Sequence, residues 1–355
     1  MSYLNVVDVN DSKKWDEIVS SFQEYDLYYM SNYTKTLKIH GDGEPQLLNF
    51  ETDELRGINV FMKRDISQFE PLKKIIEPGS CFDIVTPYGF GGFLFEGDTS
   101  EVAIERFYKK YVQKLKSENV ISEFIRYHPI INNANCMRSV STVLDLGKTI
   151  SIDLESMDLI WKNFSPNNRN NIRRAEKSGV MIFHKRSMEL LDIFKKMYNT
   201  TMDLDNANSY YYFKRDFYKS IHTDLNDNYE LFYAVLDDKI IAMSIFFFIN
   251  NRMHCHLSTS VFEYRYYAPT NLLFYEAAKW GFEQGFKTMH IGGGVGSEED
   301  DLFRFKKSFN RLSDNTFSVG KEIINQEVYN HLVKIRKEAN STFDTDSHYF
   351  PLYRA

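Results

Sequence analysis

The 355-residue chain has only three cysteines and no excess of basic residues. Cys81, Cys136 and Cys255 are odd in number, lie far apart and form no CxxC pair, which excludes a disulfide framework and favours small core residues in a reducing compartment. The net charge of −6 excludes a global positive field that would attract nucleic acid. We therefore expect no DNA partner, and any tRNA contact would need a local basic patch.

Long hydrophobic runs are also missing. The longest apolar run, Ile240 to Ile249, is too short to span a bilayer, and the N-terminal residues show no basic-then-apolar signal. We expect a cytoplasmic protein with at most peripheral membrane contact.

Several catalytic and nucleotide-binding motifs are absent. No GxGxxG, GKS/T or GxSxG pattern occurs, so Gly292–Gly294 is not a phosphate loop, and its glycines instead suggest close approach of a substrate backbone at Gly293. His254 and His256 share a strand face but have no carboxylate ligand nearby, so no metal is expected. His256 is a candidate substrate contact, with a core histidine as the competing interpretation. His128 and His290 are interpreted as core histidines.

The composition that is present suits two packed domains. Hydrophobic residues make up 43% of the chain and aromatic residues 15%. A tyrosine-rich chain can line grooves for polar ligands, although codon bias of an AT-rich genome explains the same composition.

Hydrophobic periodicity predicts the same order of elements twice: helix, helix, strand meander, helix, strand. The predicted domain boundary falls near 148–155, between apolar segments at 140–146 and 150–154, and the tail from Glu338 is expected to be loosely held. The predicted domains are 1–150, 151–322 and a C-terminal helix and tail, 323–355.

In the first half we predict helices at 13–22, 30–39 and 101–117 and strands at 45–50, 57–62 and 123–127. In the second half we predict helices at 167–177, 188–203, 270–284, 301–309 and 326–337, and strands at 231–236, 240–249, 253–259, 288–291 and near 317.

Four segments carry a resemblance to a known family. They are Ile291–Gly294 followed by Asp301-Leu-Phe-Arg-Phe-Lys-Lys-Ser-Phe309, the basic segment 168–179, the segment Phe124–Pro129, and Thr86-Pro-Tyr-Gly-Phe-Gly-Gly92. Together they resemble the FemABX family over roughly residues 80–310. The resemblance implies an α/β (α+β) fold of tandem GNAT-like domains, each a mixed, mostly antiparallel sheet flanked by helices.

The resemblance also implies an acyltransferase. FemABX proteins move an aminoacyl group from aminoacyl-tRNA to the amine of a peptidoglycan precursor, so charged tRNA would be the co-substrate, a nucleotide- or lipid-linked precursor the acceptor, and no further cofactor would be needed. A monomer would suffice. An acyl-CoA-dependent N-acetyltransferase acting on an amino sugar or amine is an alternative, with acetyl-CoA as donor. A non-catalytic GNAT-fold binding protein is a second alternative.

The family's Phe-Lys-x-x-Phe element assigns the catalytic position to Lys306, with Phe305 beside it. A cation there would stabilise a developing oxyanion or the phosphates of a donor. On residue types alone, Arg304, Lys306 and Lys307 could equally form a solvated helix face that balances the acidic residues 298–301.

Further candidates are substrate contacts. Arg169 and Arg173 lie four residues apart on one predicted helical face and could clamp a diphosphate, or simply be solvated. Tyr88 and Arg126 belong to the first-half motifs, and Asn271 lies at the start of the helix at 270–284. The preceding segment, 264–270, has no glycine and ends in Pro269-Thr270, whereas a CoA-binding GNAT domain needs backbone amides there. This departure favours aminoacyl-tRNA over CoA.

Overall fold

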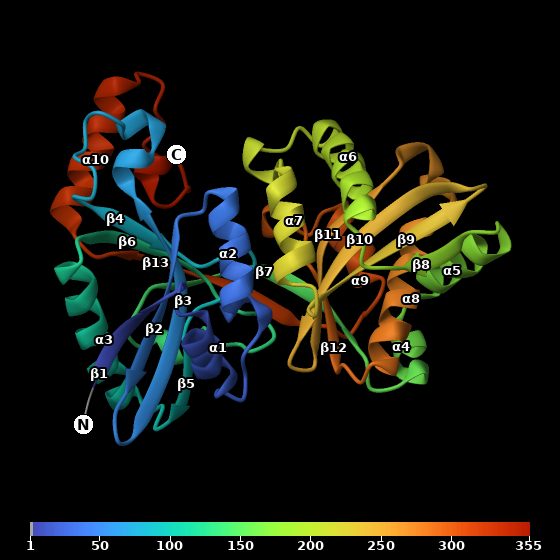
Figure 1. Ribbon diagram of the computed structural model, residues 1–355, viewed down its shortest axis with the longest axis horizontal. Helices are drawn as coiled ribbons and strands as arrows, with labels where there is room; N and C mark the ends of the chain where they lie inside the picture. Colours follow the sequence, from blue (N-terminus) through green and yellow to red (C-terminus); the bar gives the residue numbers. More distant parts are fainter. Residues whose placement is uncertain (1–2) are drawn as a thin grey trace. The chain divides into compact units, whose positions relative to one another are not determined.

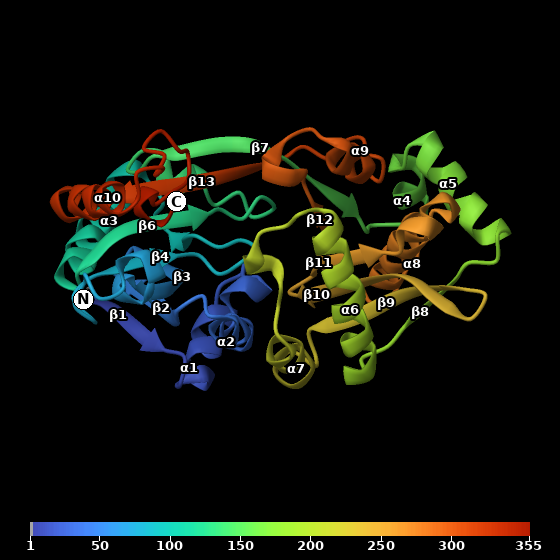
Figure 2. The ribbon, with the colours of Figure 1, turned by 90° about the horizontal axis from the view of Figure 1, so that it is seen from above.

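The computed structural model describes residues 3–355, which divide into two compact units (Figures 1 and 2). The first unit contains the N-terminal part of the chain up to Leu146 together with Phe317–Ala355, and the second contains Gly147–Thr316. The chain therefore leaves the first unit once and returns to it. The predicted division differs, because it placed residues up to 322 in the second domain and made 323–355 a separate tail.

The first unit is built on a mixed sheet in the order β1-β2-β3-β4-β6-β13, with β5 paired to β3. All neighbours are antiparallel except β4 and β6, which run parallel and are joined through helix α3. The pairing of β13 with β6 brings the end of the chain back to this unit. The strands are β1 (Tyr3–Asp8), β2 (Glu44–Glu51), β3 (Leu55–Asp65), β4 (Phe82–Val85), β5 (Leu94–Gly97), β6 (Val120–Arg126) and β13 (Asn315–Ile323); the helices are α1 (Ser12–Ser20), α2 (Ser31–His40), α3 (Glu101–Ser117) and α10 (Gln326–Ala339).

Helix α3 shows how the sequence positions a core element. Ser100 caps its first turn by accepting from the Ala103 amide at 3.4 Å. Its buried residues recur at helical spacing and include Ile104, Phe107 and Tyr111. Phe107 packs edge-on against Phe50 of β2 and Phe93, so the helix closes an aromatic core beneath the sheet.

The C-terminal segment is not loosely held, which corrects the prediction from its polarity. Tyr353 is fully buried, donates to Asp83 Oδ2 at 3.0 Å and bonds the Ser122 hydroxyl at 2.8 Å. The Arg354 guanidinium pairs with the same carboxylate at 2.5 Å, and Arg64 pairs with its other oxygen at 2.6 Å. A buried carboxylate thus ties the end of the chain to β3, β4 and β6.

Within the second unit, the strands lie in the order β7-β12-β11-β10-β9-β8. Again all neighbours are antiparallel except one pair, β11 and β12, which helix α8 connects. Strand β7 is continuous where the sequence analysis placed two segments and a domain boundary. The strands are β7 (Val143–Asp153), β8 (Met181–His184), β9 (Tyr229–Leu236), β10 (Lys239–Ile249), β11 (Arg252–Ser260) and β12 (Thr288–Gly292); the helices are α4 (Met157–Asn163), α5 (Pro166–Lys177), α6 (Met188–Leu204), α7 (Arg215–Asp224), α8 (Pro269–Glu283) and α9 (Asp301–Lys307).

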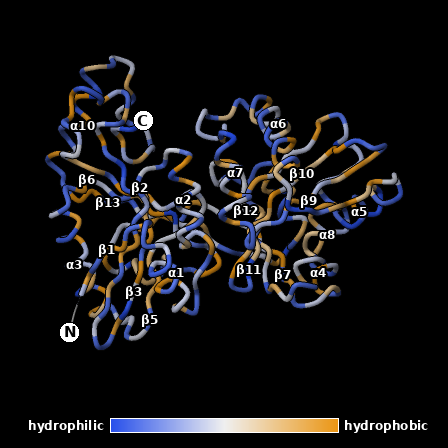
Figure 3. Tube along the Cα trace, viewed as in Figure 1, coloured by the Kyte–Doolittle hydropathy of each residue, from blue (hydrophilic) through white to orange (hydrophobic). Residues whose placement is uncertain are grey.

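Helices α6 and α8 cover opposite faces of this sheet (Figure 1). Helix α8 contacts β9 and β10, and its buried residues Leu272, Leu273, Phe274, Ala277 and Ala278 join the central hydrophobic cluster. Helix α6 contacts β11. Hydrophobic residues recur along β9 and β10 in Figure 3, which fits strands covered on both faces.

The two hairpin turns of the second unit consist of Asp and Asn residues. Asp237 and Asp238 join β9 to β10, and Asn250 and Asn251 join β10 to β11. All four residues have positive φ, between 45° and 66°. This backbone suits a two-residue turn whose twist matches the flanking strands, and Asn and Asp tolerate it better than other side chains.

Both units therefore share a meander, a crossover helix and one parallel strand pair, which is the repeated order expected from the sequence. Within residues 3–355, no helix is both long enough and apolar enough to cross a membrane. Among the elements that the sequence analysis did not predict are α7, the short helix α4 and the four-residue strands β4, β5 and β8.

A buried carboxyl group lies in the core of the first unit. Glu123 on β6 is 2% exposed, accepts from the Tyr111 hydroxyl at 2.6 Å and pairs in register with Glu322 on β13. Burial raises the pKa of Glu123 to about 8, and the Glu322 carboxylate adds to the rise, against the hydrogen bonds from Tyr111 and Asn59.

We therefore expect the stability of the first unit to fall as the pH rises. Because the folded state keeps the Glu123 proton up to about pH 8 and the unfolded state releases it near its usual, lower pKa, the free energy of unfolding should drop by roughly 1.4 kcal/mol per pH unit between these values. Urea unfolding at a series of pH values measures this slope. Glu123→Gln should flatten it, whereas Glu105→Gln, an exposed change on α3, should leave it in place; a parallel slope in Glu123→Gln would contradict the assignment.

Candidate active site

The parallel strands β11 and β12 of the second unit pair over a short stretch and then separate. Their register covers only Arg252–His254 and Thr288–His290, although β11 continues to Ser260. After His290, β12 shows an irregularity in its pairing with β7. Beyond the last paired residues, β11 continues with Cys255, and β12 ends at Gly292, which Gly293 follows.

Lys306 on α9 reaches this point. Its Nζ donates to the Gly293 carbonyl at 2.7 Å, and a Cβ placed on Gly292 would lie 3.1 Å from the same nitrogen. Burial lowers the pKa of the Lys306 ammonium, against the raising effects of Cys255 and Asp300. One hydrogen bond to a carbonyl uses one of the three ammonium donors, so this fixed group can donate to a further oxygen.

Cys255 belongs to the same surroundings. Burial raises the pKa of its thiol to about 12, while the Lys306 ammonium acts in the opposite direction. A thiol with this pKa stays protonated at neutral pH and is a poor nucleophile. The site therefore offers a cation rather than a cysteine nucleophile.

The glycine segment 292–294 allows the chain to fold tightly on itself. A Cβ on Gly293 would lie 2.7 Å from the Lys148 carbonyl, and one on Gly294 would lie 1.9 Å from the Glu298 carbonyl. Asp300 closes the loop by accepting from the amides of Phe303 and Val295 at 2.8 and 3.1 Å. These glycines thus allow the loop itself to fold tightly, and Gly293 contributes its carbonyl to Lys306. The approach of a substrate at Gly293 stays a prediction.

Phe305 and Asn271 help to position α9 and α8. Phe305 packs against Phe274 of α8 and Phe309, with ring centroids 6.1 and 5.3 Å apart. Asn271 is 8% exposed and donates to Asn168 at 2.7 Å, and the Asn168 amide donates in turn to the Ser308 carbonyl at 3.4 Å. These contacts link α8, α5 and the end of α9, so they support the helix that carries Lys306.

Arg169 and Arg173 have different surroundings although they share a face of α5. Nη1 of Arg169 donates to the carbonyls of Trp161 and Phe164 at 3.1 and 3.0 Å, which ties α5 to the end of α4. Arg173 is exposed, and its guanidinium lies 5.3 Å from the centroid of the Trp161 ring. Arg169 thus has a structural role, and the diphosphate clamp stays a prediction that rests mainly on Arg173.

His256 lies half-buried on β11. Its ring centroid is 4.3 Å from that of Phe247 on β10. Burial and the neighbouring His254 lower the pKa of His256 to about 3, so its ring is neutral at physiological pH. A neutral imidazole can accept a proton or a hydrogen bond but cannot supply a positive charge.

In the first unit, the structure brings together the two motifs that contain Tyr88 and Arg126. Nη1 of Arg126 donates to the Thr86 carbonyl at 3.3 Å, and the Gly91 amide donates to the Arg126 carbonyl at 2.7 Å. The Tyr33 hydroxyl donates to the Tyr88 carbonyl. Tyr88 and Arg126 thus come from adjacent segments.

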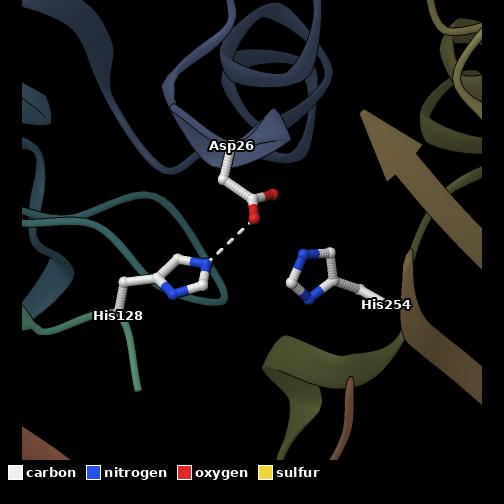
Figure 4. Close-up of side chains that lie close together, drawn as sticks. All are labelled: Asp26, His128 and His254. Atoms are coloured by element: carbon white, nitrogen blue, oxygen red, sulfur yellow. Dashed lines mark hydrogen bonds and ion pairs between the residues drawn. The ribbon is translucent and has the colours of Figure 1, made fainter. Parts of the chain in front are cut away.

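A buried Asp–His pair lies next to these motifs and was missed by the sequence analysis (Figure 4). Nε2 of His128 is 3.1 Å from Asp26 Oδ2, and both side chains are fully buried. Nδ1 of His128 accepts from the amides of Ile130 and Ile131, which leaves the proton on Nε2 and directs it to Asp26. The interpretation of His128 as a hydrogen-bonded buried histidine agrees with this geometry. Asp26 is 102 residues away, so no local pattern could reveal it.

The start of α8 has Pro269 in its first turn, which removes one of the backbone amides that a helix N-terminus usually offers. Ala268 precedes the helix with a φ of 53°, and Pro269 has no N–H. The amides of Asn271 and Leu272 donate to the Ala268 carbonyl at 3.1 and 3.4 Å. The choice between CoA and aminoacyl-tRNA as donor stays a prediction.

The chain is similar to several known proteins. Residues 162–307 match the family model of an acetyltransferase (GNAT) domain. The structure is similar to a crystal structure of FemX, with a TM-score of 0.67 and 14% identity over 93% of this chain and 99% of that chain. No curated protein sequence matches the chain.

Two further solved structures are similar. The C-terminal domain of a putative lysylphosphatidylglycerol synthetase from Agrobacterium fabrum has a TM-score of 0.54 and 13% identity, covering 89% of this chain and 92% of that one. A tandem GNAT protein from the clavulanic acid biosynthesis pathway has a TM-score of 0.51 and 6% identity, covering 92% and 99%. The predicted tandem GNAT-like fold and the prediction of an acyltransferase are confirmed.

Proposed function

We propose that this acyltransferase of the GNAT-like superfamily moves an aminoacyl group from aminoacyl-tRNA to the amine of a peptidoglycan or related cell-envelope precursor. The observation that carries the proposal is the Lys306 ammonium, which the Gly293 carbonyl holds where β11 and β12 separate. The start of α8, with Pro269 in place of an amide cradle, supports a donor other than CoA.

The proposed reaction is the attack of an uncharged amine on an ester carbonyl. A bond forms between the amine nitrogen and the carbonyl carbon, negative charge develops on the carbonyl oxygen, and the bond to the ribose oxygen then breaks as that oxygen takes up the proton that the amine loses. A fixed ammonium group stabilises the developing negative charge because it needs little reorganisation when the charge appears. Lys306 has this role in the proposal.

The names of similar structures support a cell-envelope acceptor. FemX is the structure with the TM-score of 0.67, and another similar domain is named for an aminoacylated lipid, lysylphosphatidylglycerol. A charged tRNA donor and a nucleotide- or lipid-linked acceptor are therefore the first candidates for this chain.

An acyl-CoA-dependent N-acetyltransferase acting on an amino sugar or amine is the second candidate. The acetyltransferase family model, which matches residues 162–307, favours it. This alternative requires a CoA pose that does not depend on the amides at the start of α8.

Ligand binding to the intact chain distinguishes the two functions. Acetyl-CoA, CoA, a UDP-linked muramyl pentapeptide and charged tRNA are added separately, and the thermal unfolding midpoint is measured. A ligand at 100 times its dissociation constant adds about 2.7 kcal/mol of stability. We expect stabilisation by the muramyl peptide and charged tRNA but not by CoA; stabilisation by acetyl-CoA alone would overturn the proposed donor.

A further inference from the structure

A surface of the second unit combines exposed aromatic side chains with arginines. The 3-10 helix η6 (Phe262–Tyr267) precedes α8 and contacts α5. Its Phe262 and Tyr266 are 62% and 72% exposed. We call η6 and α5 together the η6–α5 face. Large aromatic side chains with such high exposure suggest that an apolar partner or a membrane covers this surface.

The charge of the η6–α5 face is opposite to that of the whole chain. Its two elements contain five basic residues, Arg169, Arg173, Arg174, Lys177 and Arg265, and two acidic residues, Glu176 and Glu263. The surplus is +3, whereas the chain carries −6. The charge therefore fits an anionic partner at this face.

The arginines lie over the exposed rings. The Arg174 guanidinium is 5.2 Å from the centroid of Tyr266, which joins α5 to η6, and that of Arg265 is 5.0 Å from Phe262. Each aromatic group thus carries a cation beside it. Aromatic side chains that enter the acyl-chain boundary next to arginines that contact headgroups are typical of proteins bound to a membrane interface.

From these observations, we propose that the η6–α5 face binds the surface of an anionic lipid bilayer. Phe262 and Tyr266 enter the interface, and Arg174, Lys177 and Arg265 contact acidic headgroups. We favour a bilayer over a nucleic acid strand as the partner, because the Phe262 side chain has no polar atom and is stabilised most by an apolar environment. Each ring also has a guanidinium group beside it, which occupies the position where a base would stack. This inference is independent of the acyl donor and acceptor.

Sedimentation with lipid vesicles tests the proposal on the intact chain. Vesicles of phosphatidylcholine alone are compared with vesicles of phosphatidylcholine and phosphatidylglycerol in equal parts. We expect binding only to the anionic vesicles and release at high salt, because the ionic contacts are screened. Equal binding to both compositions, or no binding to either, would overturn the proposal.

Matched variants locate the surface. Phe262→Ser with Tyr266→Ser should lower the partition to anionic vesicles by about tenfold or more, because two rings no longer leave water. Val102→Ser with Leu312→Ser removes side chains that are 65% and 77% exposed elsewhere and should keep the partition unchanged. Equal losses in both pairs, or no loss in the first, would overturn the assignment of this face. Unchanged thermal midpoints confirm that the variants fold.

A single-stranded RNA oligonucleotide is the competing anion. Its binding is measured by fluorescence anisotropy with the same variants. RNA binding that depends on Phe262 and Tyr266, in a chain that does not sediment with anionic vesicles, would replace the lipid assignment. Vesicle binding that the RNA does not compete with would support it.

Discussion

Replacement of Lys306 by Met should lower kcat/KM for acyl transfer by about a hundredfold to a thousandfold. The change removes the ammonium that the Gly293 carbonyl holds 2.7 Å away, and with it the donor assigned to the developing oxyanion. Met keeps most of the side-chain volume, so α9 should remain packed through Phe305. The rate of product formation with saturating and limiting donor separates kcat from KM.

Lys307→Met is the matched control for this prediction. Lys307 lies on the same helix, and its Nζ donates to the Ser313 carbonyl at 2.5 Å rather than to Gly293. We expect this variant to keep most of its activity. Equal activity of Lys306→Met and the parent chain would remove Lys306 from the reaction and assign oxyanion stabilisation to another group.

Asp83→Asn should destabilise the first unit by about 3–5 kcal/mol. Burial alone would raise the pKa of Asp83, but the charges and hydrogen bonds of Arg64 and Arg354 lower it, so the group is ionised in the folded state. Asp83 is fully buried. An asparagine in its place has no charge, so the guanidinium groups of Arg64 and Arg354 lose their counter-ion. Urea unfolding at neutral pH measures the loss.

Two further variants define the Asp83 contribution. Asp344→Asn removes an exposed carboxylate in the same C-terminal segment and should change stability by less than about 0.5 kcal/mol. Combining Asp83→Asn with Arg354→Met should cost less than the sum of the single changes, because the second removes a cation that the first left unpaired. Strict additivity would show that the two groups do not depend on each other.

The lowered pKa also sets the direction of the acid response at Asp83. A carboxyl group whose folded pKa lies below its unfolded value contributes stability above the unfolded pKa, and this contribution is lost as the pH falls through the folded pKa. Glu123 shows the opposite sign, since its contribution is lost as the pH rises toward 8. The two groups lie in the same unit, so its stability should fall at pH values below the unfolded pKa of Asp83, 3.8, and at pH values above the unfolded pKa of Glu123, 4.5.

Local patterns in the sequence were sufficient for most of the regular elements. Helix α3 was predicted over residues 101–117 and has these bounds, since Ser100 and the spacing of Ile104, Phe107 and Tyr111 act within a few turns. The turn residues 237–238 and 250–251 likewise adopt the positive φ that Asp and Asn tolerate. Short elements such as β4 and β8 were missed because four residues contain too little periodicity.

The candidate site was predictable only in part. The resemblance of the segment around Phe305 and Lys306 assigned the central lysine, but not the carbonyl that holds it. Gly293 comes within reach of Lys306 only because the loop through Gly294 and Asp300 folds back on itself. The four-residue spacing of Arg169 and Arg173 suggested a diphosphate clamp. It could not show that Arg169 donates to backbone carbonyls at the end of α4.

The sequence by itself determined the classes of element and their repeated order, because propensity, turn chemistry and hydrophobic spacing act over short distances along the chain. The candidate lysine came from the resemblance of its segment to a known family. Only the tertiary structure decided that residues 317–355 complete the first unit and that Asp83 meets Arg64, Tyr353 and Arg354. It also decided the pairing of Asp26 with His128. These contacts join residues 19 to 271 positions apart, and their partners depend on how strands pair and helices pack rather than on any local pattern.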